Sequence, residues 1–318
     1  MAMRGKESEN GVYEFPYMKP PQRSAWESFR TGCYDSKNGT VLGRNGKSWA
    51  QILFFYLIFY AVLAALFSIC MKGLLSTIDE REPKWKMDSS LIGNNPGLGF
   101  RPISNRTEEG SLIWFNSRNA TSIQKWVGFT EDFMQPYREA STGKNRVICD
   151  FDKMPTGDQV CHVDLDKFGA CGPKNHYGFN SSSPCIFLKL NRIFDWVPDY
   201  YDDPKNLPEN MPQQLKDKIV GLPPSQRKQV WVSCIGEHPA DKEHVSQFEY
   251  LPSQGFPSYY YPYRNAPGYL SPIVAVQIRQ PTPNVLINIE CRSWAKNINY
   301  RGGNQREGSV RFEIMRDI

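Results

Sequence analysis

Hydrophobic residues concentrate in one uninterrupted run near the N-terminus. Residues 48–71 contain no charged side chain, and Lys47 and Lys72 flank them. A helix of that length covers roughly 36 Å at ~1.5 Å per residue, enough to cross a bilayer core of about 30 Å. A cleavable signal peptide would instead place a short apolar core close to residue 1. We therefore predict a transmembrane helix over residues 48–71, preceded by a polar tail, residues 1–47.

The C-terminal half follows a different pattern, in which apolar and polar residues alternate with a period of two. This alternation is typical of half-buried strands in an antiparallel sheet, and Pro and Gly residues between the segments indicate turns. The segments are 186–191, 230–234, 274–279, 285–292 and 310–314. We expect residues 72–145 to form a stalk and a loop-rich region, and residues 146–318 to form a β-sandwich.

Cysteine positions add a constraint on this sandwich. Six of the eight cysteines lie after the apolar run, and none of them shows the C-x-x-C spacing of a zinc or redox site, so disulfides are the better account. Six cysteines allow 15 connectivities. Cys234 and Cys291 both fall on the inward face of their strands, and a bridge between them is expected to pin two sheets together through the core, as in an immunoglobulin-like sandwich. We expect sequential pairing, which is Cys149–Cys161, Cys171–Cys185 and Cys234–Cys291.

The membrane orientation follows from the cysteines and the glycosylation sequons, because Lys and Arg are balanced on the two sides of the span. Asn105, Asn119 and Asn180 each begin an N-glycosylation sequon, and all three lie after the span. Disulfides persist in oxidising compartments. We therefore expect a type II membrane protein with a cytoplasmic tail and a mainly β, disulfide-bonded and glycosylated ectodomain.

Two aromatic stretches are candidate contact surfaces. Tyr56 and Tyr60 are four residues apart and share a helix face that continues through Ala64 and Phe67. Tyr56 lies deeper in the membrane than the interfacial belt, so its hydroxyl needs a hydrogen-bond partner from another membrane protein. The alternative is that the helix is a passive anchor. In the ectodomain, the second stretch suits a protein interface, or else a buried corner of the core. Its aromatic residues are Phe256, Tyr259, Tyr260, Tyr261 and Tyr263.

Composition and motifs give little support for catalysis or nucleic-acid binding. The chain has 38 Lys and Arg against 33 Asp and Glu, without the long run of like charge expected of a nucleic-acid tail. No nucleophile elbow, P-loop or H-E-x-x-H motif occurs, so we expect no metal and no cofactor. Asp164-Leu-Asp166 resembles the D-x-D of luminal glycosyltransferases, but the strand-rich half lacks alternating strands and helices. A transferase remains a remote alternative.

A series of short motifs runs along the chain in the order Gly43-Arg44, Ser48-Trp49, Phe55-Tyr56, Phe59-Tyr60, Phe168 to Gly172, Pro184 to Phe187, Lys189 to Ile193, Gly255 to Pro257, Tyr260 to Tyr263 and Ile289 to Cys291. Together these motifs are similar to those of sodium/potassium-transporting ATPase β subunits of the invertebrate type. Asn45 stands where the family usually has Thr, and Arg264 replaces an aromatic residue. The cysteine order alone would equally suit a proton/potassium pump β subunit.

The resemblance implies a non-catalytic subunit of an ion pump in the plasma membrane. The catalytic α subunit hydrolyses ATP and moves sodium and potassium, while the β subunit folds α, delivers it from the endoplasmic reticulum and modulates potassium occlusion. By this resemblance Tyr56 and Tyr60 would meet an α helix within the lipid bilayer, and residues 259–263 would cover an extracellular α loop. A FXYD-like small subunit and adhesion partners on neighbouring cells are further possible partners. A free-standing adhesion glycoprotein or receptor of the same topology is the alternative.

Overall fold

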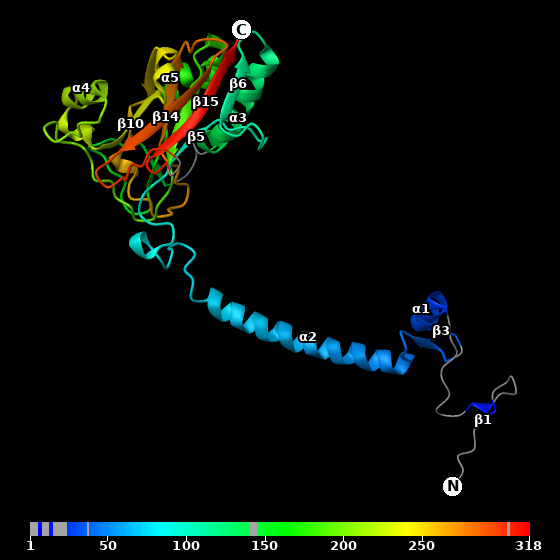
Figure 1. Ribbon diagram of the computed structural model, residues 1–318. Coiled ribbons are helices and arrows are strands. Elements are labelled where there is room, and N and C mark those ends of the chain that lie inside the picture. Colours follow the sequence, from blue (N-terminus) through cyan, green and yellow to red (C-terminus); the bar gives the residue numbers. More distant parts are fainter. Residues whose placement is uncertain (1–5, 8–12, 15–23, 37, 140–144, 304–305) are drawn as a thin grey trace. The chain divides into compact units, whose positions relative to one another are not determined.

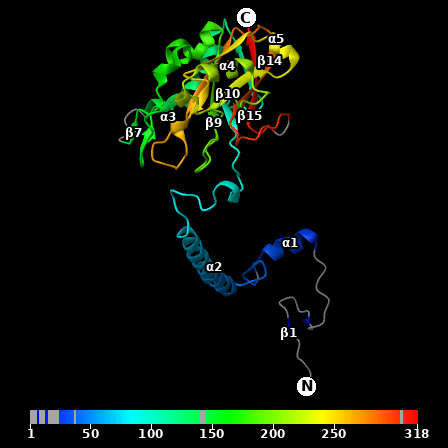
Figure 2. The same cartoon turned by 90° about the vertical axis from the view of Figure 1, so that its left-hand side faces the viewer.

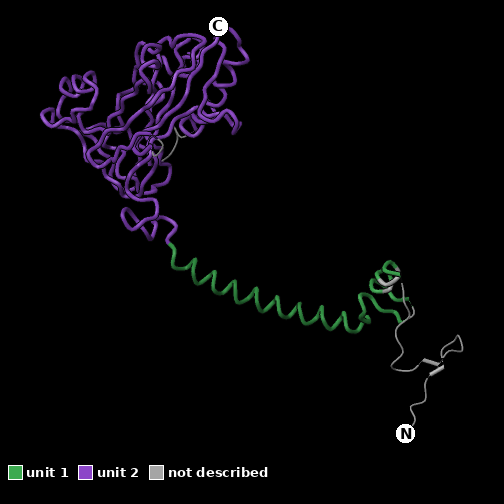
Figure 3. Tube along the Cα trace, in the orientation of Figure 1, with its two compact units in different colours: residues 1–78 green, residues 79–318 purple. Residues whose placement is uncertain are grey.

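The computed structural model describes residues 6–7, 13–14, 24–36, 38–139, 145–303 and 306–318. The chain divides into two compact units, residues 1–78 and 79–318 (Figure 3). The first unit contains two short antiparallel strand pairs and two helices. They are β1 (Lys6–Glu7), β2 (Tyr13–Glu14), α1 (Ala25–Cys33), β3 (Tyr34–Asp35), β4 (Thr40–Val41) and α2 (Gly46–Leu75).

Helix α2 contains the whole predicted span and extends it at both ends. Asn45 caps its N-terminus by accepting a hydrogen bond from the Ser48 backbone N–H at 2.9 Å. The helix has 30 residues, about 45 Å at ~1.5 Å each, and none of its side chains is buried among the described residues. It is the one helix in the described ranges that is long and apolar enough to cross a membrane. This agrees with a single-pass membrane protein.

The second unit is built on two stacked sheets (Figure 1). The five-stranded sheet has the order β12-β10-β14-β15-β6, and the four-stranded sheet has the order β11-β13-β9-β5. The strands of the first are β12 (Gly255–Pro257), β10 (Gln229–Gly236), β14 (Leu286–Trp294), β15 (Ser309–Asp317) and β6 (Leu112–Asn116). Those of the second are β11 (Gln247–Leu251), β13 (Ile273–Arg279), β9 (Cys185–Leu190) and β5 (Leu98–Arg101). The pairings are antiparallel except for β15 with β6, which is parallel.

One hydrophobic core lies between the two sheets. The rings of Phe100 on β5 and Phe312 on β15 approach to 5.1 Å between centroids, and both belong to the same buried cluster. Cys234 stands opposite Cys291 in the β10–β14 register, so their disulfide joins neighbouring strands of the five-stranded sheet. The expectation that this bridge pins the two sheets together is corrected. Cys149–Cys161 and Cys171–Cys185 are the other two bridges, so the pairs follow the expected sequential order. The mainly β, disulfide-bonded sandwich is confirmed.

Helical segments cover the outer faces of the sheets on opposite sides of the strands (Figures 1 and 2). On the four-stranded sheet, Phe187 of β9 packs against rings from three elements: Phe133, Phe168 and Tyr177. On the five-stranded sheet, Trp231 and Trp294 form a second buried cluster with apolar side chains from α4 and from the residues just before this helix. The covering elements are α3 (Ala120–Glu139), η3 (Leu165–Cys171), η4 (Pro173–Ser181) and α4 (Gln213–Gly221).

Two sequence expectations are corrected here. Strands β9, β10 and β13 are buried on both faces rather than half-buried, because the covering helices exclude water from the outer face; the alternation holds for β14 and β15. Residues 72–145 were expected to be stalk and loop, yet they contribute β5, β6 and the helix α3 to the sandwich. The sheets therefore begin before residue 146.

Short elements complete the unit. The parallel pair β7–β8 joins the ends of the first disulfide loop, and α5 packs against β10 and β14. The remaining bounds are η1 (Met87–Ser89), β7 (Arg146–Val147), β8 (Val160–Cys161), η5 (Pro224–Arg227), α5 (Pro239–Glu243) and η6 (Ser258–Tyr260).

Candidate functional site: aromatic contact surfaces

The predicted tyrosine face of α2 is present and exposed. The Tyr56 and Tyr60 rings stack with centroids 5.9 Å apart, and the two side chains are 48% and 59% exposed. Phe67 and Ala64 are also exposed on this face. Neither tyrosine hydroxyl has a hydrogen-bond partner among the described residues, whereas the Ser68 hydroxyl donates to the Ala64 carbonyl at 2.7 Å. The two phenols are thus polar groups of this helix that remain to be satisfied in lipid.

The ectodomain aromatic stretch is divided between core and surface. Phe256 is 0% exposed, because β12 pairs with β10 and turns this ring into the sandwich. Tyr260 is also buried, and its hydroxyl donates to the His162 carbonyl at 3.2 Å. Both residues were expected at an α-subunit contact; neither offers enough surface for one, so this expectation is corrected. The alternative of a buried core corner describes these two residues.

Tyr261 is partly buried, and its ring lies edge-on to Trp196 with centroids 5.6 Å apart. Burial raises its pKa well above the ordinary value, and its hydroxyl has no partner among the described residues. Tyr259 is also half-buried and packs against Phe151 at 5.5 Å. Burial, reinforced by Asp150, raises the pKa of Tyr259 to about 12. Both phenols are therefore neutral hydrogen-bonding groups at physiological pH.

Tyr263 borders a pocket that the sequence analysis did not find, here called the juxtamembrane pocket. Its volume is about 430 Å³, and it is lined by most of the residues between 79 and 93 together with Arg192, Ile193, Phe194, Tyr263 and Asn265. Its first lining residue follows the end of α2 by four positions along the chain. The pocket is therefore built from the segment that connects the sandwich to the span.

Cation–π and ionic contacts hold the walls of the juxtamembrane pocket together. Lys86 lies over the Phe194 ring at 4.5 Å and pairs with Glu82 at 2.8 Å and Asp195 at 3.2 Å. The hydrogen bond that the Lys86 ammonium donates to the Glu82 carboxylate is the main cause that raises the Lys86 pKa. The Arg192 guanidinium lies 5.4 Å from the Tyr263 ring centroid. The run Phe194-Asp195-Trp196, three positions after the end of a predicted strand, was the sequence signal that could have identified this wall.

The three sequon asparagines are all exposed. Asn119 accepts a hydrogen bond from the Thr121 backbone N–H at 2.9 Å through its side-chain oxygen, next to the first turn of α3. Asn180 lies with its amide nitrogen 2.6 Å from His176 Nδ1. Their exposure leaves glycosylation of all three as a prediction that the fold permits.

The D-x-D motif has a structural role. The Asp164 carboxylate accepts a hydrogen bond from the Asp166 backbone N–H at 3.0 Å and caps η3, while Asp166 is exposed. Among the described residues there is no group of three or more His, Cys, Asp and Glu side chains placed to hold a metal.

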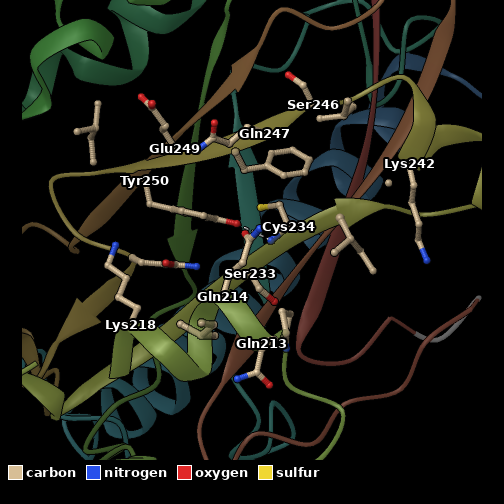
Figure 4. Close-up of a pocket in the computed structure, with 18 residues that line it drawn as sticks. Gln213, Gln214, Lys218, Ser233, Cys234, Lys242, Ser246, Gln247, Glu249 and Tyr250 are labelled. Carbon is tan, nitrogen blue, oxygen red and sulfur yellow. Dashed lines mark hydrogen bonds between the residues drawn. The ribbon is translucent and has the colours of Figure 1, made fainter. Parts of the chain in front are cut away.

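A groove lies between β10, β11 and the start of α4 (Figure 4). Its volume is about 680 Å³. At its floor the Tyr250 hydroxyl accepts a hydrogen bond from the Cys234 backbone N–H at 2.8 Å. Its charged side chains, Lys218, Lys242 and Glu249, come from three different elements, and Figure 4 shows them spread around the rim. The groove thus lacks the paired acid and base that catalysis of proton transfer needs.

Comparison with known proteins covers nearly the whole chain. A family model described as sodium/potassium ATPase beta chain matches residues 19–312. The chain is 47% identical to sodium/potassium-transporting ATPase subunit beta-1 of Drosophila melanogaster over 318 residues, 100% of both chains. It is 43% identical to subunit beta-2 of the same organism over 309 residues, 95% of each chain. It is 30% identical to subunit beta-1 of Tetronarce californica over 314 residues, 92% of this chain and 95% of that one.

Proposed function

Because this chain belongs to the sodium/potassium ATPase beta chain family, we propose that it folds, assembles and delivers the catalytic α subunit to the plasma membrane. In the assembled pump it modulates sodium and potassium transport without hydrolysing ATP itself. The observation that carries this proposal is the pair of stacked, unsatisfied tyrosines on a helix long enough to span a bilayer.

A partner helix explains the tyrosine face better than lipid does. An unpaired hydroxyl in hydrocarbon is costly, since no water is available to bond it. Hydrogen bonds between membrane helices contribute about 0.6 kcal/mol on average. The face of Tyr56, Tyr60, Ala64 and Phe67 therefore suits docking against an α-subunit helix, with two hydrogen bonds available to it.

The extracellular contact is assigned to the exposed part of the second aromatic stretch. Tyr259, Tyr261 and Tyr263 retain partial exposure, and Tyr263 adjoins the juxtamembrane pocket. Aromatic side chains held by prolines lose little entropy on binding. We assign the α-subunit loop to this surface, with Phe256 and Tyr260 supporting it from the core.

The type II orientation is part of the same proposal. All three disulfides and the three exposed sequons lie in the unit formed by residues 79–318. Disulfides and N-glycans both arise in the secretory lumen. The sandwich is then extracellular and residues 1–45 are cytoplasmic.

The test is co-purification from gently solubilised membranes. A much larger polypeptide with ouabain-sensitive ATPase activity is expected to follow this chain. Replacing Tyr56 and Tyr60 with Phe removes both hydroxyls, so the retained α subunit should fall about eightfold, the factor equivalent to two interhelical hydrogen bonds at ~0.6 kcal/mol each. Phe54→Leu, an exposed change within the same helix, is the matched control and should retain α.

Two outcomes would contradict this proposal. Recovery of the chain alone at normal expression would favour the free-standing adhesion protein. Unchanged α retention and unchanged potassium dependence in the Tyr56→Phe, Tyr60→Phe variant would remove the assigned docking face while leaving the family membership intact.

A further inference from the structure

The segment before α2 folds back onto the first turn of that helix. The Trp49 indole N–H donates to the Val41 carbonyl at 2.9 Å, and Trp49 is the fourth residue of α2. The Leu42 backbone N–H donates to the Cys33 carbonyl at 3.1 Å, which ties the end of α1 to the same place. Figures 1 and 2 both show α1 near the N-terminal end of α2. We call α1, β3 and β4 together the juxtamembrane hairpin.

This attachment sets the depth of the juxtamembrane hairpin relative to a bilayer. The polar headgroup layer is only about 5–7 Å thick on each side of the hydrocarbon core. Trp49 begins the apolar run, and tryptophan concentrates at the membrane interface. The Val41 carbonyl, which is bonded to the Trp49 ring, therefore lies within or beside the headgroup layer. The hydrogen bond between Leu42 and Cys33 holds the end of α1 next to this position.

The hairpin exposes an unusual amount of aromatic and aliphatic surface. Trp26 and Phe29, three residues apart on α1, stack with ring centroids 5.9 Å apart and are 73% and 63% exposed. Tyr34 of β3 and Leu42, directly after β4, are 59% and 60% exposed. No described residue buries these four side chains. In water this surface is costly, whereas Trp and Tyr are favoured at membrane interfaces.

The charge of the segment is complementary to an anionic lipid surface. Arg30 lies in the last turn of α1, and Arg44 and Lys47 are exposed next to the start of α2. In sequence, residues 24–48 carry four basic side chains, Arg30, Lys37, Arg44 and Lys47, against two acidic ones, Glu27 and Asp35. The Asp35 carboxylate accepts a hydrogen bond from the Asn38 side chain at 2.8 Å.

We propose that the juxtamembrane hairpin is a second membrane contact of this protein, an interfacial anchor that lies on the headgroups of an anionic leaflet. Trp26 and Phe29 enter the boundary between headgroups and acyl chains, and Arg30 binds anionic headgroups. The continuity of the hairpin with α2 selects lipid as its occupant, because the tether holds these side chains at the bilayer surface whether or not a partner protein is bound. This inference needs only that α2 spans a membrane; it is independent of the α-subunit docking.

The test is hydrogen exchange of residues 25–42 in the full-length chain, without any α subunit. The chain is reconstituted in nanodiscs of phosphatidylcholine alone or with 30% phosphatidylserine, and compared with detergent micelles. Exchange is expected to be slowest in the phosphatidylserine discs. In these discs the double variant Trp26→Ser, Phe29→Ser should exchange about tenfold faster than wild type, because it lacks two partly inserted aromatic rings.

Charge is tested separately by Arg30→Gln. In phosphatidylserine discs this variant should exchange about fivefold faster than wild type, the factor equivalent to ~1 kcal/mol for one basic residue near an anionic surface. In discs of phosphatidylcholine alone its exchange rate should equal that of wild type. Arg30→Lys should restore the wild-type rate. Trp114→Ser, which removes a 55% exposed tryptophan from the other unit, is the matched control and should have no effect.

Two results would overturn the anchor. One is equal exchange of residues 25–42 in discs and micelles, with the Trp26, Phe29 double variant indistinguishable from wild type. The other is protection that appears only when an α subunit is added, since the surface would then serve a protein. Neither result would affect co-purification with α, so failure of this inference and failure of the proposed function are distinguishable.

Discussion

Asp241 on α5 is expected to be one of the most sensitive polar positions in the ectodomain. Its carboxylate is buried and accepts backbone N–H groups from two segments, His238 at 3.0 Å and Asn288 at 3.0 Å. The Asn288 side-chain amide donates to it as well, at 3.3 Å. Asp241 therefore joins α5 to the first part of strand β14.

The cost of Asp241→Ala follows from the donors that it leaves without an acceptor. A buried unsatisfied donor costs about 1–3 kcal/mol. The donors are partly buried, so we take the lower part of that range for each of the three donors. The free energy of unfolding of Asp241→Ala should therefore fall by about 3 kcal/mol in total. For a domain of this size each kcal/mol lowers Tm by roughly 2–4 °C, which predicts a fall of about 6–12 °C.

The pH dependence provides a second measure of the same contact. Burial alone would raise the pKa of Asp241, but the hydrogen bonds from Asn288 and His238 outweigh it and lower the pKa below 3.8. A carboxyl with a lowered folded-state pKa stabilises the fold fully above its unfolded-state pKa and loses that contribution as the pH falls through the folded-state value. The difference between wild type and Asp241→Ala should therefore be constant near neutral pH and shrink below about pH 4.

The assay is thermal unfolding of the detergent-solubilised full-length chain, followed by tryptophan fluorescence across pH. Glu243→Ala removes an exposed carboxylate from the same helix and is the matched control, expected to change stability by no more than about 0.5 kcal/mol. If Asp241→Ala lowers Tm no further than Glu243→Ala does, the reasoning from unsatisfied donors is refuted. A difference between wild type and Asp241→Ala that persists undiminished below pH 4 would refute the role of the charge.

Two further predictions concern the sandwich core. Replacing both cysteines of Cys234–Cys291 with Ala should lower the free energy of unfolding by about 4 kcal/mol, and the same change at Cys149–Cys161 by about 3, because the sequence separations are 57 and 12 residues. Denaturant unfolding of the two variants in parallel checks this, and a larger cost for the shorter loop would contradict the loop-entropy account. Phe187→Ala should cost about 3–5 kcal/mol, since its ring is 0% exposed and contacts three aromatic neighbours. A loss below about 1 kcal/mol in the same assay would mean that the covering segments collapse into the space.

The sequence of helix α3 contains the apolar periodicity of an α-helix. Its buried residues recur at helical spacing, as Ile123, Trp126, Val127, Thr130 and Met134. The Gly and Pro residues that precede this stretch, and the sequons around it, favoured an interpretation as loop. The helix is stabilised by packing against β6 and η4 rather than by unusual propensity.

The sequence by itself determined the features that depend on local composition. An uncharged run of that length requires a membrane or a core, and period-two alternation requires strands, whatever the rest of the chain does. In the same way, six cysteines and three sequons on one side of the span predict disulfides and glycosylation on that side. These inferences need no knowledge of which residues meet in space.

Only the tertiary structure decided which aromatic residues remain available for contact. Phe256 and Tyr263 are seven residues apart in one aromatic stretch, yet the pairing of β12 with β10 buries the first, while the second borders the juxtamembrane pocket. Likewise β9 alternates like a half-exposed strand but is buried on both faces, because α3, η3 and η4 return to cover it. Burial depends on what packs opposite a side chain, and those partners come from segments too distant in sequence for any local pattern to specify.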